Sequence, residues 1–292
     1  MSDRAATQSY TACPPTPIRT TATTESGQSP AEPCTPGVTT SQDQQAQSND
    51  QELAQTLTFP GILITAGSYT TFLGTILLCI LAGAVIGNEY SFGTQRLALS
   101  RGVSRAQLIV AQVAALALLA LIVTGAMLLL GTLFGVTVGP LVGGVIPNIP
   151  LAGWGQLLLY WLVVSLNLLA YALIALLFGT LGRSTAVGIA GSLGYIIFEL
   201  IVAPILLALA VGFQGGSVGT TAEVVHHALL GPNLSALING VTQSPLSLGG
   251  SSASDLGISP IPAAQGLFIS LLYCVTLVGL SYWLVRARDV TH

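Results

Sequence analysis

The sequence predicts an all-α membrane protein, a polytopic bundle of about five transmembrane helices. Apolar residues make up 52% of the 292 residues and charged residues only 7%, which is a balance that soluble domains do not show. Five apolar runs each reach the roughly 20 residues needed to cross about 30 Å of hydrocarbon. A buried helix in a soluble domain needs only one apolar stripe, so runs of this length indicate a bilayer. They cover residues 61–86, 108–136, 157–179, 187–212 and 264–285.

The chain before the first run has a different composition. Residues 1–56 are rich in Thr, Ser, Gln and Pro and have no apolar period. Such a segment buries too little apolar surface to offset its ordering entropy, so we expect a disordered tail followed by a membrane domain over 57–292. Cys13 and Cys34 lie in this tail, where a disulfide and two free thiols both remain open. Cys79 and Cys274 lie inside apolar runs and are interpreted as small hydrophobic residues.

The first three runs carry the signals of closely packed helices. Ser104 and Gln107 form the pattern of a capping box that opens the second run. Two glycine series at a spacing of four predict close helix–helix contacts. Hydroxyl and amide side chains inside the second and third runs are expected to form interhelical hydrogen bonds. The glycines are Gly83 and Gly87, and Gly131, Gly135 and Gly139; the polar residues are Thr124, Ser165 and Asn167.

Glu199 is the acidic residue that stands deep within the fourth run. An ionisable group inside a membrane is costly and by default suggests a function, such as facing a substrate path or carrying a proton. The alternative is a protonated carboxyl that is hydrogen-bonded to a neighbouring helix or placed at a dimer interface. Pro204, five residues later, is expected to bend this helix and to leave a backbone carbonyl without its usual donor.

The connection over residues 213–263 contains neither Lys nor Arg. Its segment 221–240 is expected to form a short external amphipathic helix that covers the bundle. His226 and His227 follow Glu223, but adjacent histidines do not share a helix face and the chain has no zinc-binding pattern. We therefore expect no metal site, and the pair is interpreted as a surface feature.

The arginines set the orientation of the bundle. Connections 88–107, 180–186 and 286–292 hold all six arginines of the membrane domain, whereas 137–156 and 213–263 hold none. By the positive-inside rule the first set is cytoplasmic, so the C-terminus is cytoplasmic and five spans leave the N-terminal tail outside. Either the tail is truly external, or a first helix is missing upstream; we favour the missing helix. The six arginines are Arg96, Arg101, Arg105, Arg183, Arg286 and Arg288.

The connection between the first two runs is the sequence feature that is most specific for a function. Glu89 and Arg96 are seven residues apart, so in a helix they share one face, and a short amphipathic helix on the membrane surface is one interpretation. A solvated loop whose arginines only fix topology is the other. The chain contains no lysine and therefore no Walker A lysine, so any ATP must be bound by another polypeptide.

The sequence EYSFGTQRLALSRGVSRAQLIVAQ, residues 89–112, resembles the first cytoplasmic loop of ABC transporter permeases of the type-two, exporter-like family. The resemblance implies a coupling helix that docks in a groove of a cytoplasmic ATPase subunit. The contact and pivot residues it implies are Glu89, Tyr90, Gly93, Thr94 and Arg96. It also implies a non-enzymatic subunit that works in a homo- or heterodimer with two ATPase copies and without nucleic acid. Family members usually have six spans, and here the first is absent.

Other classes fit the sequence less well. An intramembrane protease needs a catalytic dyad or a metal within the spans, and every His lies outside the apolar runs. A stand-alone secondary transporter needs broken helices with several midplane polar groups, for which only the Glu199–Pro204 region offers a hint. A non-transporting anchor or sensor derived from a truncated permease also remains open. The Ala, Leu and Gly bias suggests a GC-rich bacterial genome, and hence a bacterial plasma membrane.

Overall fold

The computed structural model describes residues 61–92, 104–138, 151–213, 215–242 and 261–287, together with residues 102 and 140. By its contacts the chain divides into two units, Met1–Gln45 and Ala46–His292, and every described residue belongs to the second. The described part of this unit is helical, with no strand in those ranges. The predictions for the tail and for Cys13, Cys34, Gly93, Thr94, Arg96 and Gly139 fall outside the described residues.

Five helices in the described ranges are long and apolar enough to cross a membrane, which confirms the predicted fold class. Each extends slightly beyond its predicted apolar run. The first combines α2 (Gly61–Tyr69), a π-helical turn η1 (Thr70–Gly74) and α3 (Thr75–Ser91). The others are α5 (Arg105–Val138), α6 (Leu151–Gly182), α7 (Thr185–Gly212) and α10 (Ala263–Ala287).

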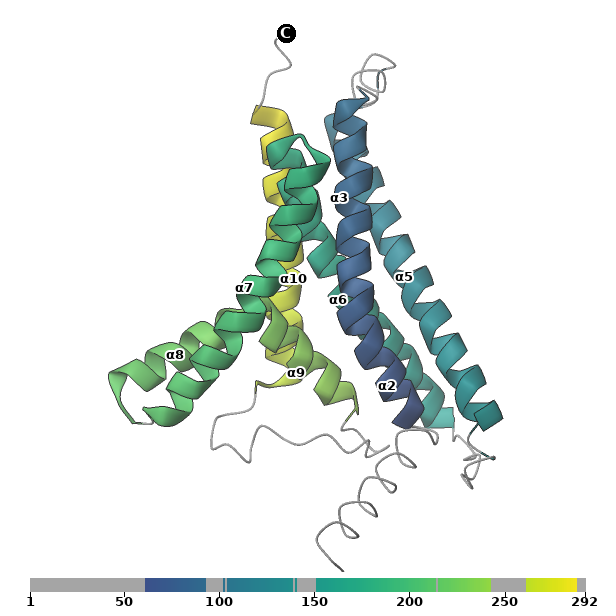
Figure 1. Cartoon of the computed structure of the whole chain (residues 1–292), viewed down its shortest axis with the longest axis vertical. Helices are drawn as coiled ribbons and strands as arrows, with labels where there is room; N and C mark the ends of the chain where they lie inside the picture. The colour runs from purple at the N-terminus through teal and green to yellow at the C-terminus, as the bar shows by residue number, and fades with distance from the viewer. Residues whose placement is uncertain are drawn as a thin grey trace, which may run out of the picture. The chain divides into compact units, whose positions relative to one another are not determined.

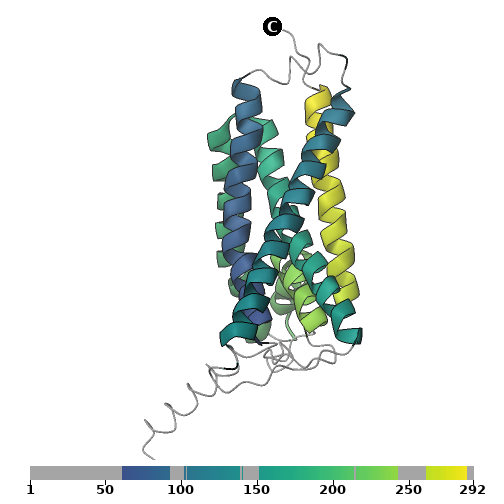
Figure 2. The ribbon, with the colours of Figure 1, turned by 90° about the vertical axis from the view of Figure 1, so that its right-hand side faces the viewer.

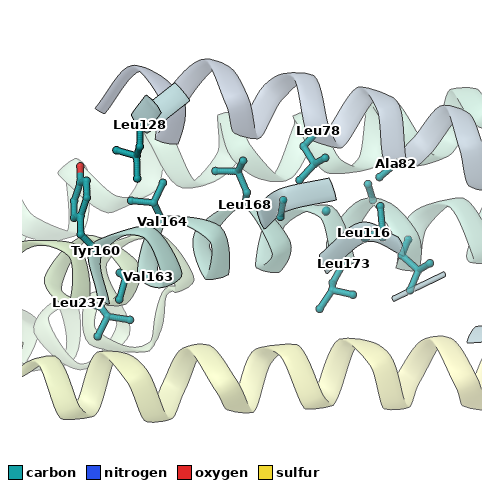
Figure 3. Close-up of a cluster of buried hydrophobic side chains, with 14 of the residues drawn as sticks. Leu78, Ala82, Leu116, Leu128, Tyr160, Val163, Val164, Leu168, Leu173 and Leu237 are labelled. Carbon is teal, nitrogen blue, oxygen red and sulfur yellow. The ribbon is translucent and has the colours of Figure 1, made fainter. Parts of the chain in front are cut away.

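The third span, α6, is the centre of the packing. Its residues Val164, Leu168, Ala172 and Leu176 follow one another at intervals of four and are all fully buried. The neighbouring helices cover this stripe, and Figure 3 shows Leu78, Leu116 and Leu128 from α3 and α5 close to α6 side chains. The remaining helices leave long rows of Leu, Ile, Val and Phe exposed, as expected where lipid takes the place of a protein neighbour.

The described members of both predicted glycine series lie where a neighbouring helix approaches closely. Gly83 and Gly87 of α3 lie against Ile189 and Thr185 at the start of α7. A β-carbon at Gly87 would lie 2.3 Å from the backbone nitrogen of Thr185, which no real structure accommodates. Gly131 and Gly135 of α5 lie in the same way against Ala66 and Ile62 of α2.

The predicted interhelical hydrogen bonds are also present. The hydroxyl groups of Thr124 in α5 and Ser165 in α6 are 2.6 Å apart. Asn167 of α6 donates its amide to the hydroxyl of Thr75 at 3.2 Å. Thr75 follows the π-helical turn, so this bond connects α6 to the irregular part of the first span.

The arginine-bearing junctions lie at one end of the bundle. The end of α3, the start of α5, the junction between α6 and α7 and the end of α10 meet there (Figures 1 and 2). Two short helices, α8 (Ser217–Ala228) and α9 (Leu230–Thr242), occupy the other half.

The single covering helix predicted over 221–240 is wrong. The segment instead forms α8 and α9, which break at Leu229. Pro232 explains the break, because its ring would clash with the carbonyl of Ala228 in a continuous helix, whereas proline is tolerated in the first turn of a new one. The second helix, α9, is largely buried rather than lying over the bundle: Leu230, Leu234, Leu237 and Val241 all belong to the core.

Candidate functional site

Glu89 joins the end of the first span to the second. It lies in the last turns of α3, and its carboxylate accepts a hydrogen bond from the side-chain amide of Gln112 in α5. Tyr90 follows it in the same helix. These two residues therefore continue α3, and a separate coupling helix that contains Gly93, Thr94 and Arg96 stays a prediction.

The start of α5 is fixed by the predicted capping box. The backbone N–H of Ser104 donates to the side-chain oxygen of Gln107 at 3.0 Å, and the N–H of Gln107 donates to the Ser104 hydroxyl at 3.2 Å. Two backbone donors at the helix start are thereby satisfied. The first turn of α5, which carries Arg105, has a defined position as a result.

Arg105 connects this turn to the far end of the chain. Its Nη1 donates to the carbonyl oxygens of Val285 at 3.0 Å and of Arg286 at 3.3 Å. These carbonyls belong to the last turn of α10, where helix acceptors lack intrahelical partners and a positive charge is favoured. The last turns of α3 are thus bonded to α5, and the first turn of α5 is bonded to the end of α10.

Glu199 occupies the second candidate region. Its side chain is only 5% exposed, and one carboxyl oxygen accepts a hydrogen bond from the Tyr171 hydroxyl of α6 at 2.6 Å. The other oxygen accepts a hydrogen bond from the backbone N–H of Gly231 in the first turn of α9. The hydrogen bond to a neighbouring helix, one part of the interpretation of Glu199, is therefore present, and a role of this residue in transport stays a prediction. A carboxyl at a helix N-terminus is also favoured by the helix dipole.

The bond to Gly231 places the break between α8 and α9 at the level of Glu199, near the middle of α7. Non-helical backbone at this depth is tolerated only when its polar groups are satisfied by protein. The side-chain amide of Asn233 donates to the carbonyls of His227 and Leu229, both at 2.7 Å. The Tyr273 hydroxyl of α10 donates to the carbonyl of Ala228 at 3.0 Å.

Sequence reasoning missed the partners of Glu199, because they come from two other helices, α6 and α9. The signal that could have found one of them is the dipeptide Gly231-Pro232, a helix break inside an otherwise helical segment. Position 231 also requires glycine for steric reasons. A β-carbon there would lie 2.9 Å from Cδ of Glu199 and 3.1 Å from the Tyr171 hydroxyl.

The two histidines lie in the last turn of α8. Partial burial lowers the pKa of His226, and His227 beside it acts in the same direction, while Glu223 opposes the shift. The neutral imidazole is therefore favoured. Within the described ranges no group of three His, Cys, Asp or Glu side chains is placed to hold a metal ion.

Comparison with protein-family models gave a match to the family described as ABC-2 family transporter protein, over residues 21–290. Neither a curated protein nor a solved structure matched the chain. The family match covers all five membrane-long helices. The resemblance seen in residues 89–112 is thereby confirmed, and the chain belongs to the ABC-2 transporter family as a multi-pass membrane protein with a permease role.

Proposed function

We propose that this permease is the membrane subunit of an ABC exporter and that the connection between α3 and α5 couples it to a separate ATPase. Glu89, Tyr90, Gly93, Thr94 and Arg96 are the residues of contact. The observation that carries the proposal is the attachment of this connection at both of its ends. Glu89 is bonded to α5 before it, and Arg105 is bonded to α10 after it.

These bonds could transmit a movement of the connection to several spans. A rigid-body displacement of the connection acts on three spans, because Gln112 belongs to α5 and Val285 to α10, while Glu89 continues the first span. Closure of the ATPase pair on ATP would favour the bundle state in which the docked connection is displaced. That is a population shift driven by different affinities for two states.

Orientation supports the same assignment. The described arginines of the membrane domain, Arg105, Arg183 and Arg286, belong to the start of α5, the junction of α6 and α7 and the last turn of α10. These three segments and the end of α3 lie at the same end of the bundle (Figure 1). By the positive-inside rule this end faces the cytoplasm of a bacterial cell, where the ATPase and ATP are found. The C-terminus then is cytoplasmic, and α8 and α9 lie toward the outer face.

We assign the binding and hydrolysis of ATP to the separate ATPase subunit. The chain has no lysine with which to build a Walker A loop, so it contributes motion rather than catalysis. Export rather than import, and a working pair of permeases, follow from the resemblance of residues 89–112 to exporter-like permeases.

Two substitutions in the connection test the docking. Arg96→Glu reverses a charge on the proposed contact surface, and Gly93→Pro fixes the backbone at the proposed pivot. We expect each to reduce copurification of the ATPase by about tenfold, since one lost charged hydrogen bond corresponds to that order of change. The measurement is the ratio of ATPase to permease after affinity purification from membranes.

Arg19→Glu is the matched control, because it makes the same charge change in the tail. It should leave the ratio of ATPase to permease unchanged. Wild-type levels of ATPase on both the Arg96→Glu and Gly93→Pro permeases would exclude this connection as the docking site.

A further inference from the structure

We propose that the hydrogen bonds of Glu199 with Tyr171 and Gly231, here called the latch, hold α9 in its packed position between α6, α7 and α10, here called its seat. We further propose that these bonds break during the transport cycle. This inference rests on the proposed function, because it needs an ATP-driven cycle. It makes Glu199 a positioning residue, which acts through α9.

The seat of α9 is defined at both ends by polar contacts. At its start, the N–H of Gly231 donates to the carboxyl of Glu199 in α7, which also accepts a hydrogen bond from the Tyr171 hydroxyl of α6. At its end, the side-chain amide of Gln156 in α6 donates to the carbonyl of Val241 at 2.7 Å.

The middle of α9 lies directly on α10 and α6. A β-carbon at Gly266 of α10 would lie 2.6 Å from the carbonyl oxygen of Asn233, so the two backbones are in contact. Leu237 belongs to the buried cluster that includes Tyr160 and Val163 of α6 (Figure 3). While it stays seated, α9 therefore fills the space between these spans in the half of the bundle opposite the arginines.

The seat also contains polar atoms without partners. Asn233 and Ser270 are 0% exposed, yet Oδ1 of Asn233 and Oγ of Ser270 have no hydrogen-bond partner in the described part of the chain. The same holds for Nε2 of His227 at the end of α8. Buried polar groups without partners destabilise the arrangement that contains them. This is expected of a helix with a second position in which these atoms reach water or other groups.

These contacts together describe a bistable element. The apolar face of α9 and the bonds of Glu199 favour the seated position, and the unpaired groups oppose it. Glu199 can shift the equilibrium between the seated and released positions of α9, because its carboxyl contacts both α6 and the first turn of α9. Loss of the bond between Glu199 and Gly231 releases the first turn of α9 from α7.

Amide hydrogen exchange, followed by mass spectrometry on the full permease–ATPase complex in lipid nanodiscs, tests the latch. Glu199→Gln replaces the carboxyl by an amide of nearly the same shape, and Tyr171→Phe removes only the donor hydroxyl. Each should raise the exchange rate of residues 230–238 by about tenfold, because exchange reports the population of the locally open state. Residues 164–176 of α6 serve as the internal reference and should keep their rate.

Thr124→Val is the matched control variant, because it also removes one buried interhelical hydrogen bond, here to Ser165 between α5 and α6. It should leave the exchange of α9 unchanged. Unchanged exchange of α9 in both latch variants would overturn the proposal. So would a rise that extends through α6, since that would show a general loss of packing.

Addition of ATP tests whether the bonds of Glu199 open during the transport cycle. In the wild-type complex ATP should raise the exchange of residues 230–238, whereas in Glu199→Gln the exchange should be high with or without ATP. A bound ATPase that hydrolyses ATP with no change in α9 would reduce Glu199 to a static clamp and overturn the latch. Failure of any ATPase to copurify would instead contradict the proposed function, so the two failures are distinguishable.

Discussion

Replacing Gly87 by alanine is expected to destabilise the bundle by about 3 kcal/mol, the upper end of the usual range for overpacking. The added methyl group would lie 2.3 Å from both the nitrogen and Cα of Thr185. These are backbone atoms at the start of α7, so no side-chain rotation can relieve the contact. The first span and α7 would have to separate. The measurement is the thermal unfolding midpoint of the detergent-solubilised permease.

Gly194→Ala is the control for this change. It makes the same substitution within α7, at a glycine whose added β-carbon meets nothing within 4 Å. Alanine favours a helix over glycine by about 1 kcal/mol, so this variant should be as stable as the wild type or slightly more stable. Equal midpoints for Gly87→Ala and the wild type would contradict the close approach of the first span and α7.

Replacing Arg105 by alanine is expected to leave the ATPase bound but to reduce ATP-driven transport by about tenfold. A hydrogen bond from a charged donor contributes about 1.5–3 kcal/mol, and a tenfold change corresponds to about 1.4 kcal/mol. Arg105 donates to the carbonyl oxygens of Val285 and Arg286 at the end of α10. Its loss should therefore interrupt transmission to α10 without removing the docking surface.

The measurement compares two quantities on the same preparation: the ratio of ATPase to permease, and transport per ATP hydrolysed in proteoliposomes. Arg105→Lys keeps a charged donor and should recover part of the transport. Gln112→Leu, which removes the bond to Glu89, should resemble Arg105→Ala. Full transport by the Arg105→Ala permease would show that α10 is not driven through this contact.

Several local contacts near the candidate site could be predicted from short-range sequence patterns. The capping box of Ser104 and Gln107 was predictable because both partners lie within one helical turn. The glycine series at Gly83 and Gly87 indicated close packing because a spacing of four aligns residues on one helix face. Neither pattern says which helix lies opposite, and the structure supplies α7.

The partners of Glu199 show where prediction from the sequence ends. Tyr171 is 28 residues away and Gly231 is 32 residues away, and no periodicity relates residues on different helices. The error over segment 221–240 has a similar origin. Its composition suits a surface helix, but Pro232 divides it, and burial against α6 and α10 outweighs its polar character.

The sequence by itself indicated five helices that are long and apolar enough to cross a membrane, and which junctions gather at one end. Hydrocarbon thickness and arginine placement are properties that can be counted along a chain. Only the tertiary structure decided that Arg105 reaches α10 and that Glu199 meets the start of α9. The reason is physical, since both contacts join groups that are brought together by helix packing, and packing depends on the shapes of many side chains at once.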